Sequence, residues 1–288
     1  MTVDRVFATV AEVTGDVQAG FTDRRHATGT NPTGDEQLRA DVQADQLLAD
    51  RLLALDLVAS YTSEERPSVT ASGTETGGQY HIACDPLDGS SNLASNNPAG
   101  TIIGVYDQRP PAPGTALLAA GYVLYGPVTT MVVAVDDGGG QTVTEYLLKN
   151  GERRVLDADV QLPETPTVYG LGGRVPDWPA PIVEYVDAIE ADRLKLRYGG
   201  AMVADVNQVL AQGGVFGYPM LVDRPEGKLR AVFEALPMAY IMTAAGGAAS
   251  DGTEPLLATA PDNLHERTPV FVGSEPLIER LEETLEQA

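Results

Sequence analysis

The sequence lacks several features that would place it in particular classes of protein. Its 288 residues include one cysteine, three lysines and no apolar run of about 20 residues. A single cysteine excludes a disulfide framework and a thiolate zinc site within one chain. The missing apolar run excludes a membrane-spanning helix, and the N-terminus lacks the basic and apolar regions of a secretory signal. We therefore expect a cytoplasmic protein with no membrane partner.

Positive charge is also scarce. The chain carries 19 basic and 41 acidic residues, which gives a formal net charge of −22. Binding to nucleic acid needs a basic surface, so this balance excludes nucleic acid as a partner. The acidic residues are scattered, a pattern typical of proteins from a high-salt cytoplasm, where salt screens their mutual repulsion. The fold is therefore expected to depend on salt. Because basic residues are so rare, a lysine or arginine near a candidate site is a stronger indication of function.

One stretch carries most of the chemistry, the eight residues Asp85-Pro86-Leu87-Asp88-Gly89-Ser90-Ser91-Asn92. They follow the apolar run Tyr80–Cys84, which is typical of a buried strand. The two carboxylates favour a cation, and the free N–H groups of the Gly-Ser-Ser-Asn turn favour a phosphate. The alternative is an Asp-Gly turn whose polar residues only cap a helix. Taken alone, the stretch supports both interpretations equally.

Two further acidic groups precede this stretch. A helix is predicted from Thr33 onwards, with Asp35 at its start and Asp41 six residues into it. An acidic residue at a helix start is usually a cap, which explains Asp35 better than Asp41. The predicted strand at residues 57–61 ends close to Glu64 and Glu65. Two successive strands therefore end in acidic residues, as is common in metal sites.

The remaining pattern predicts two layered α/β halves, residues 1–160 and residues 161–288. A first helix is expected at residues 3–17, and the Pro-containing stretch 157–167 is the predicted boundary. The glycines at 138–140 are interpreted as a hairpin turn, because no helix follows them. Predicted strands lie at 101–106, 117–125, 129–135, 142–148, 168–171, 193–198, 215–222, 229–234 and 270–272, and predicted helices at 182–189, 202–210, 237–246 and 277–285.

If the acidic residues at these strand and helix ends converge, they need cations. Two like charges 4 Å apart repel by about 4 kcal/mol at an effective dielectric constant near 20. Ligands that are all oxygen select Mg²⁺ or Mn²⁺ over zinc or copper. The three histidines, His26, His81 and His265, are dispersed and are expected to be structural or exposed. The candidate set is Asp35, Asp41, Glu64, Glu65, Asp85, Asp88 and Glu234.

Residues 85–92 resemble the signature of the class I fructose-1,6-bisphosphatase family, within the lithium-sensitive, metal-dependent sugar phosphatases. The resemblance is an ordered series from about residue 31 to residue 274, which is far more specific than one Asp-Gly-Ser-Ser match. The further motifs are Thr33-Gly34-Asp35 with Asp41, Ser63-Glu64-Glu65, Gly100-Thr101-Ile102, Ala119-Ala120-Gly121-Tyr122 with Leu124-Tyr125-Gly126, Met202-Val203-Ala204-Asp205-Val206, Gly213-Gly214-Val215-Phe216 with Tyr218-Pro219, Gly227-Lys228-Leu229-Arg230, Glu234, Pro237-Met238-Ala239-Tyr240 and Gly246-Gly247.

The resemblance implies a layered α-β-α-β-α fold and a gluconeogenic activity. The implied reaction is hydrolysis of the 1-phosphate of fructose 1,6-bisphosphate to fructose 6-phosphate, with Mg²⁺ as cofactor and Mn²⁺ as its substitute. The implied metal ligands are Glu64, Asp85, Asp88, Glu234 and the carbonyl group of Leu87. The implied catalytic residues, which orient and deprotonate the attacking water, are Glu65, Asp41 and Asp35. The implied phosphate donors are the amides of Gly89, Ser90 and Ser91, beside Asp88.

The resemblance also implies a pocket for the second phosphate. Its residues are Arg197, Tyr198 and Tyr218, with Lys228 on the sugar. Arg197 would reach across from a neighbouring subunit, which implies a homo-oligomer, a dimer or a tetramer. The packing of tyrosines at the edge of a core is the alternative explanation. Lys228 favours a functional role, because lysine is so rare here.

Two positions depart from the family pattern. Gly172 and Val175 stand where the family has an asparagine and a tyrosine of the second-phosphate pocket. Arg174 is the expected substitute, since a guanidinium can bind a phosphate through two hydrogen bonds. The alternatives are therefore a sedoheptulose-1,7-bisphosphatase and a broader inositol-phosphate-type phosphatase; Glu234 favours the sugar bisphosphatases. A non-catalytic binding protein would lack a ligand, and none is missing. Gln79 replaces a lysine of the family's AMP site, so no AMP inhibition is expected there.

Overall fold

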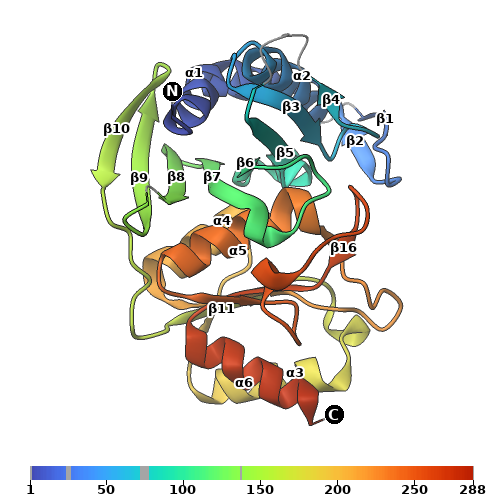
Figure 1. The fold of residues 1–288 in the computed structure, drawn as a ribbon. Helices are drawn as coiled ribbons and strands as arrows, with labels where there is room; N and C mark the ends of the chain where they lie inside the picture. Colours follow the sequence, from blue (N-terminus) through green and yellow to red (C-terminus); the bar gives the residue numbers. More distant parts are fainter. Residues whose placement is uncertain (1, 24–26, 72–77, 137, 288) are drawn as a thin grey trace.

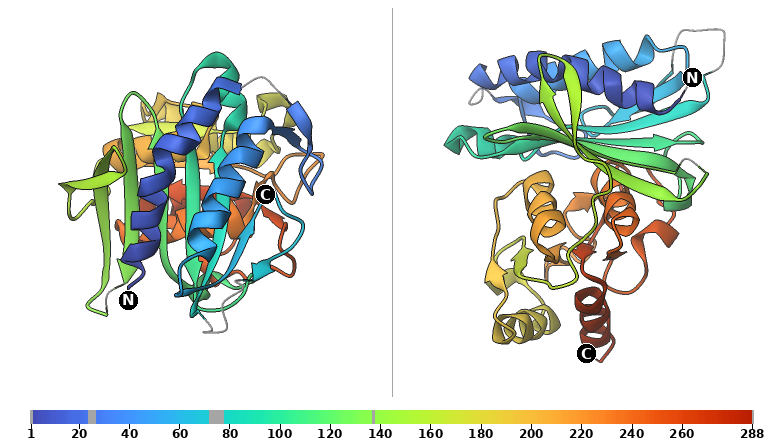
Figure 2. Two further views of the ribbon diagram at one scale, coloured as in Figure 1. Left: turned by 90° about the horizontal axis from the view of Figure 1, so that it is seen from above. Right: turned by 90° about the vertical axis from the view of Figure 1, so that its left-hand side faces the viewer.

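The computed structural model describes residues 2–23, 27–71, 78–136 and 138–287, which form a stack of alternating helical and sheet layers (Figure 1). Helices α1 (Asp4–Ala19) and α2 (Arg39–Leu53) cover the outer face of an eight-stranded sheet. Helices α4 (Met202–Gln212) and α5 (Leu236–Ala244) lie between it and a five-stranded sheet. Helices α3 (Ala180–Ala191) and α6 (Glu275–Glu286) cover the far face of the second sheet (Figure 2). The predicted α-β-α-β-α order is confirmed.

The eight-stranded sheet has the order β10-β9-β8-β7-β6-β5-β3-β4. Its neighbours are antiparallel except for β3 and β5, which run parallel. The two strands that carry the predicted acidic groups are therefore hydrogen-bonded neighbours near one edge. The strands are β3 (Val58–Ser63), β4 (Thr70–Ala71), β5 (Tyr80–Asp88), β6 (Ala99–Tyr106), β7 (Leu117–Tyr125), β8 (Thr129–Asp136), β9 (Gln141–Lys149) and β10 (Glu152–Asp157).

Most of these strands were predicted within two residues, with three exceptions. The two-residue strand β4 was not predicted. Strand β10 was missed, because it is an exposed edge strand without apolar alternation. Strand β5 continues through Asp88, where the prediction ended it at Cys84. The three glycines at 138–140 lie between β8 and β9, whose antiparallel pairing confirms the hairpin turn.

The five-stranded sheet has the order β12-β11-β13-β17-β15. Two predicted strands here are too long. The strand predicted at 193–198 is confined to β12, and the strand predicted at 215–222 ends before Pro219, which has no N–H group to donate to a ladder. The strands are β11 (Val168–Leu171), β12 (Lys195–Leu196), β13 (Gly214–Tyr218), β15 (Ala248–Ser250) and β17 (Val270–Gly273). The division of the chain into two subdomains at residue 160 stays a prediction.

The predicted start of the second helix is wrong. Residues Glu36–Leu38 form strand β2, paired with β1 (Ala27–Thr30), and α2 begins only at Arg39. Asp35 therefore lies in a hairpin turn and not at a helix start. Asp41 lies in the first turn of α2, where its Oδ2 accepts the Leu38 N–H at 2.6 Å. The capping role that the spacing assigned to Asp35 belongs to Asp41.

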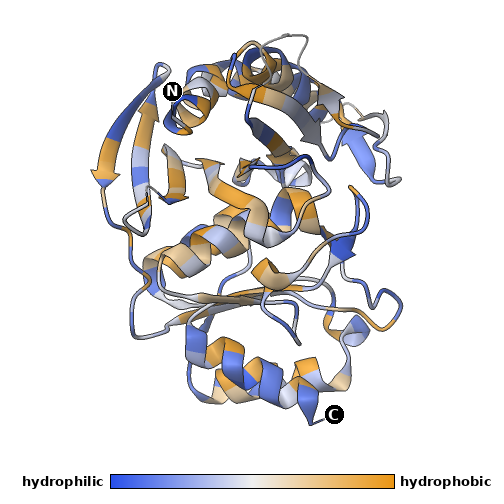
Figure 3. Cartoon of the chain, viewed as in Figure 1, coloured by the Kyte–Doolittle hydropathy of each residue, from blue (hydrophilic) through white to orange (hydrophobic). Residues whose placement is uncertain are grey.

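Apolar side chains fill the spaces between the layers, and the outward faces of α3 and α6 are largely hydrophilic (Figure 3). Phe7 and Leu48 belong to the cluster under α1 and α2, Phe233 and Met238 to the cluster between the sheets, and Phe271 to the outer cluster. This burial is the main stabilising force, and it fixes the strand ends rigidly. Among the described residues, no helix is long and apolar enough to cross a bilayer.

Candidate active site

A cavity of about 290 Å³ lies where the strand ends of the first half face the second half. Carboxylates far outnumber cations among its lining residues. The predicted site residues that line it are Asp35, Asp41, Glu64, Glu65, Asp85, Leu87, Asp88, Gly89, Ser90, Ser91, Tyr198, Tyr218, Lys228 and Glu234. Arg197 and Arg174 are not among them. The structure thus brings the predicted carboxylates and the predicted phosphate loop, Gly89-Ser90-Ser91, into a single cavity.

A β-bulge brings the two aspartates of strand β5 to the same side. In a regular strand, residues three apart point to opposite faces. Here the pairing with β6 shifts register between Asp85, which faces Ile102, and Asp88, which faces Gly100, so the strand carries one extra residue. Bulges of this kind re-aim side chains next to active sites. Thr101 holds the bulge by donating its hydroxyl to the Pro86 carbonyl oxygen at 2.9 Å.

Asp85, Asp88 and Glu234 form the candidate metal centre. One carboxylate oxygen from each lies within 4.8 Å of the others, and all three residues are buried. Burial and the neighbouring carboxylates raise the pKa of Asp85 well above its ordinary value and that of Asp88 to about 7. Three buried carboxylates without a cation between them repel each other. An all-oxygen set fits a hard divalent cation such as Mg²⁺.

Glu234 reaches the centre from an unusual piece of backbone. The predicted strand 229–234 is confined to β14 (Leu229–Arg230), and the chain then makes a π-helical turn, Ala231–Ala235, before α5. The Glu234 carboxylate accepts the backbone N–H of Arg230 at 2.6 Å. Single π-turns are frequent at functional sites, and this one aims a carboxylate from the second half at the strand ends of the first.

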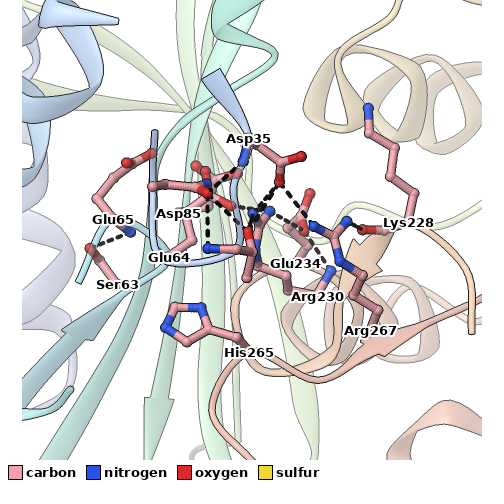
Figure 4. A network of polar contacts seen from close by, with 12 residues as sticks. Asp35, Ser63, Glu64, Glu65, Asp85, Lys228, Arg230, Glu234, His265 and Arg267 are labelled. Atoms are coloured by element: carbon pink, nitrogen blue, oxygen red, sulfur yellow. Dashed lines mark hydrogen bonds and ion pairs between the residues drawn. The ribbon is translucent and has the colours of Figure 1, made fainter. Parts of the chain in front are cut away.

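Arg230 is the principal residue that the sequence interpretation missed. Its guanidinium lies among the carboxylates of Glu64 (2.6 Å), Asp35 (2.6 Å) and Glu234 (3.9 Å) (Figure 4). Burial alone would lower the pKa of Arg230, but these carboxylates raise it above its ordinary value. The sequence offered one indication of its importance: Arg230 lies two residues after Lys228 in a chain poor in basic residues. Glu64, a predicted metal ligand, is held by this guanidinium, and its role as a ligand stays a prediction.

Two arginines, Arg230 and Arg267, hold the β1–β2 hairpin at the cavity. Asp35 accepts hydrogen bonds from Arg230 at 2.6 Å and from Arg267 at 3.0 Å. Burial raises the pKa of Asp35, but the two guanidiniums outweigh burial and lower it. Gln37 of the hairpin also donates to the carboxylate of Glu65. The hairpin therefore brings Asp35 and Glu65 together at the cavity wall.

The backbone at Glu65 is positioned by the buried side chain of Asp45. The hydroxyl of Ser63 donates to Asp45 at 2.6 Å and accepts the Glu65 N–H at 3.1 Å. Arg66 donates to the other oxygen of Asp45 at 2.8 Å. Burial raises the pKa of Glu65. The turn that follows β3 is thus anchored in the core, and this fixes the backbone from which Glu65 projects.

The phosphate loop depends on Gly89. Its φ of +70° lies in the left-handed region, and a Cβ there would lie 2.4 Å from the Cβ of Ala201. A short 3₁₀-helix, Ser90–Ser95, follows it. Asp41 faces this loop, and burial raises its pKa to about 7. A group that gains and loses a proton near neutral pH therefore lies beside the predicted phosphate site.

The far end of the cavity contains Tyr198, Tyr218 and Lys228, and the Lys228 Nζ lies 5.3 Å from the centre of the Tyr218 ring. Gly172 lets that ring approach closely, because a Cβ at this position would lie 2.3 Å from it. Arg174 is exposed and does not line the cavity.

Arg197 is also exposed, and its guanidinium donates to the Leu196 carbonyl oxygen at 2.9 Å. Of the histidines, His81 contacts Ser60 and His265 contacts the Arg66 carbonyl oxygen, both away from the cavity lining. His26 lies outside the described residues.

The layered α/β architecture, the carboxylate cluster and the phosphate loop with its backbone N–H groups are together typical of metal-dependent phosphatases. Comparison with known proteins agrees. The family models "Fructose-1-6-bisphosphatase, N-terminal domain" and "Fructose-1-6-bisphosphatase, C-terminal domain" match residues 16–152 and 162–286. The chain belongs to the class 1 fructose-1,6-bisphosphatase family.

Relatives and solved structures match over nearly the whole chain. The class 1 fructose-1,6-bisphosphatase of Natronomonas pharaonis is 55% identical over 98% of this chain and 98% of its own. That of Haloarcula marismortui is 53% identical over 99% and 95%. The fructose-1,6-bisphosphatase of Leishmania major in its holo form has a TM-score of 0.88 at 29% identity, covering 99% of this chain and 96% of its own. The first two come from halophilic archaea, in keeping with the acidic composition.

Proposed function

We propose that this chain hydrolyses the 1-phosphate of fructose 1,6-bisphosphate to fructose 6-phosphate and phosphate, with Mg²⁺ as cofactor and Mn²⁺ as its substitute. The observation that carries the proposal is one cavity with two unlike ends. At the near end, the carboxylates of Asp85, Asp88 and Glu234 meet the phosphate loop. At the far end, Lys228 and two tyrosines offer a site for a second anion. The names of the relatives support the substrate.

The near end holds the metal and the phosphate being cleaved. Asp85, Asp88 and Glu234 would hold divalent cations, together with the Glu64 side chain and the Leu87 carbonyl group. Bound cations of this kind neutralise charge on the transferring phosphoryl group and lower the pKa of the attacking water. The N–H groups of Gly89, Ser90 and Ser91 bind the phosphoryl oxygens. No phosphoenzyme is needed, so the two serines act through their amides.

Asp41 and Glu65 are the proposed acceptors of the proton from the attacking water. Both have a raised pKa, and that of Asp41 is about 7, which suits a general base at neutral pH. Asp35, with its lowered pKa and two guanidinium partners, is a poor base and orients its neighbours instead. A positioned base contributes roughly 10²–10⁴-fold to the rate.

The far end binds the second phosphate. Lys228, Tyr198 and Tyr218 contact the sugar and its distal phosphate. Arg197, exposed and turned to its own Leu196 carbonyl group, is available to a neighbouring subunit, which supports a homo-oligomer. Arg174 is the proposed additional phosphate contact at the rim. The cytoplasmic location stays a prediction.

The test is phosphate release at high salt from fructose 1,6-bisphosphate, sedoheptulose 1,7-bisphosphate and inositol 1-phosphate. We expect fructose 1,6-bisphosphate to give the highest kcat/KM, and we expect chelation to abolish turnover until Mg²⁺ is restored. Full activity in the presence of a chelator would contradict the metal assignment. A higher kcat/KM for either other substrate would contradict the substrate assignment.

A further inference from the structure

The side chain of Asn92 joins the two ends of the cavity. Its Nδ2 donates to the carbonyl oxygen of Gly199 at 2.8 Å and to that of Pro98 at 2.9 Å. Asn92 directly follows Ser91 of the phosphate loop, and Gly199 directly follows Tyr198 of the far end. A single carboxamide therefore spans from the loop that faces the cleaved phosphate to the loop that carries a far-end tyrosine.

Asp205 of α4 holds the same far-end loop from its other side. Its Oδ1 accepts the Gly199 N–H at 2.6 Å, and its Oδ2 accepts the Gly200 N–H at 3.2 Å. Asp205 is buried, and α4 packs against both sheets. A buried carboxylate with two backbone donors is a strong anchor. The peptide groups of Gly199 and Gly200 are thus hydrogen-bonded to Asn92 on one side and Asp205 on the other.

The phosphate loop and the loop that carries Tyr198 are packed closely against each other. A Cβ on Gly89 would lie 2.4 Å from the Ala201 side chain, and a Cβ on Gly200 would lie 3.1 Å from the Asn92 Oδ1. Asp88 accepts the backbone N–H of Val203, at the start of α4, at 2.7 Å. Because the two loops are packed this closely, a displacement of one loop is transmitted to the other.

We propose that Asn92 and Asp205 are positioning residues that set the separation between the phosphate loop and Tyr198. This separation selects substrates with two phosphates at a fixed span over substrates with one. The inference rests on the proposed function, because it assumes that the near end cleaves and the far end binds the second phosphate. Neither side chain needs to touch the reacting atoms to act in this way.

The test compares fructose 1,6-bisphosphate with fructose 1-phosphate, which keeps the cleaved phosphate and lacks the distal one. The measured quantity is the ratio of their kcat/KM values with Mg²⁺. In Asn92→Ala we expect this ratio to fall about tenfold, the change that corresponds to losing one good hydrogen bond. The fall should arise from a higher KM for the bisphosphate, with kcat for fructose 1-phosphate within about twofold of wild type.

Asn97→Ala is the matched control. Asn97 lies in the same segment, but it is exposed, and its Nδ2 donates to the nearby Ser95 hydroxyl at 3.1 Å. We expect its ratio to equal that of wild type. Asp205→Asn tests the other anchor without touching the phosphate loop, and it should also lower the ratio. It carries the test alone if Asn92→Ala does not fold, as judged by circular dichroism.

Three results would overturn the inference. One is an unchanged ratio in folded Asp205→Asn or Asn92→Ala. A second is an equal loss on both substrates, which would mean that these residues only maintain the fold. The third is an equal fall in Asn97→Ala. Failure of the proposed function is a different result, because wild-type protein would then release no phosphate from fructose 1,6-bisphosphate.

Discussion

The near and far ends of the cavity are built in different ways. At the near end, Asp85, Asp88 and Glu234 are 2%, 7% and 5% exposed, and they project from a bulged strand and a π-turn locked in the core. At the far end, Tyr198 is 45% exposed and lies on a loop beside the two-residue strand β12. The difference indicates that the groups proposed for bond cleavage are fixed by the core. The groups proposed to recognise the rest of the substrate depend on contacts between loops.

The largest expected effect is at the near end. Asp88→Asn removes a charge from the candidate metal centre and keeps the shape of the side chain. We expect kcat to fall by at least about a thousandfold, since charge stabilisation at such a centre is worth several kcal/mol. Circular dichroism should be unchanged. The control is Asp187→Asn, an exposed aspartate on α3 that should keep full activity. Activity near wild type in Asp88→Asn would show that the site is assigned wrongly.

Arg230→Met should destabilise the metal-free protein. It would leave the carboxylates of the buried Glu234 and the partly buried Glu64 without their cation, and removing one partner from a buried ion pair costs about 3–5 kcal/mol. Urea unfolding at constant high salt measures this. Arg280→Met breaks the exposed pair with Asp192 and should cost about 0–1 kcal/mol. Equal losses in the two variants would mean that Arg230 does not neutralise the near end.

The stability of the metal-free protein should depend on pH in a direction set by the near end. The pKa values of Asp41 and Asp88 are raised to about 7, so the folded state binds more protons than the unfolded state between about pH 4 and pH 7. The free energy of unfolding therefore falls as the pH rises through this window.

We expect this free energy to be a few kcal/mol higher at pH 5.5 than at pH 8. Mg²⁺ should stabilise the protein more at pH 8, where it does not compete with protons. Thermal unfolding at both pH values, with Mg²⁺ and with a chelator, measures both effects. A metal-free protein that is more stable at pH 8 would contradict the assignment of the raised pKa values.

The smallest effect belongs to the far end. In Gly172→Ala, the new Cβ would lie 2.3 Å from the Tyr218 ring and push it aside. We expect KM for fructose 1,6-bisphosphate to rise a few-fold, with an unchanged kcat, because the near end is untouched. Gly15→Ala, on α1 with open space around its Cβ, is the control. A fall in kcat without a change in KM would mean that the two ends are not separable.

The convergence of the near-end residues could be predicted because their signals are local. Asp85 and Asp88 follow a strand pattern directly, and Glu64 and Glu65 follow another. Strand ends of one sheet meet at one edge, so their convergence followed from the fold class. The bulge between the two aspartates was not foreseen, because it depends on the pairing of β5 with β6.

Long-range contacts account for what the sequence did not reveal. Arg230 contacts Glu64, which lies 166 positions earlier in the chain, and no local pattern reports such a pair. The hairpin at Asp35 was mistaken for a helix start. Its turn is held both by local hydrogen bonds to the Asn31 side chain and by the distant Arg230 and Arg267, and the two distant contacts have no signal in the local sequence. At the far end, the proposed role of Arg197 requires a second subunit.

The most direct test of the near-end assignment is anomalous diffraction from a crystal grown with Mn²⁺ in place of Mg²⁺. We expect peaks within bonding distance of the carboxylates of Asp85, Asp88 and Glu234, and the loss of these peaks in Asp88→Asn or after chelation. Strong Mn²⁺ peaks elsewhere, with none at these three carboxylates, would contradict the near-end assignment.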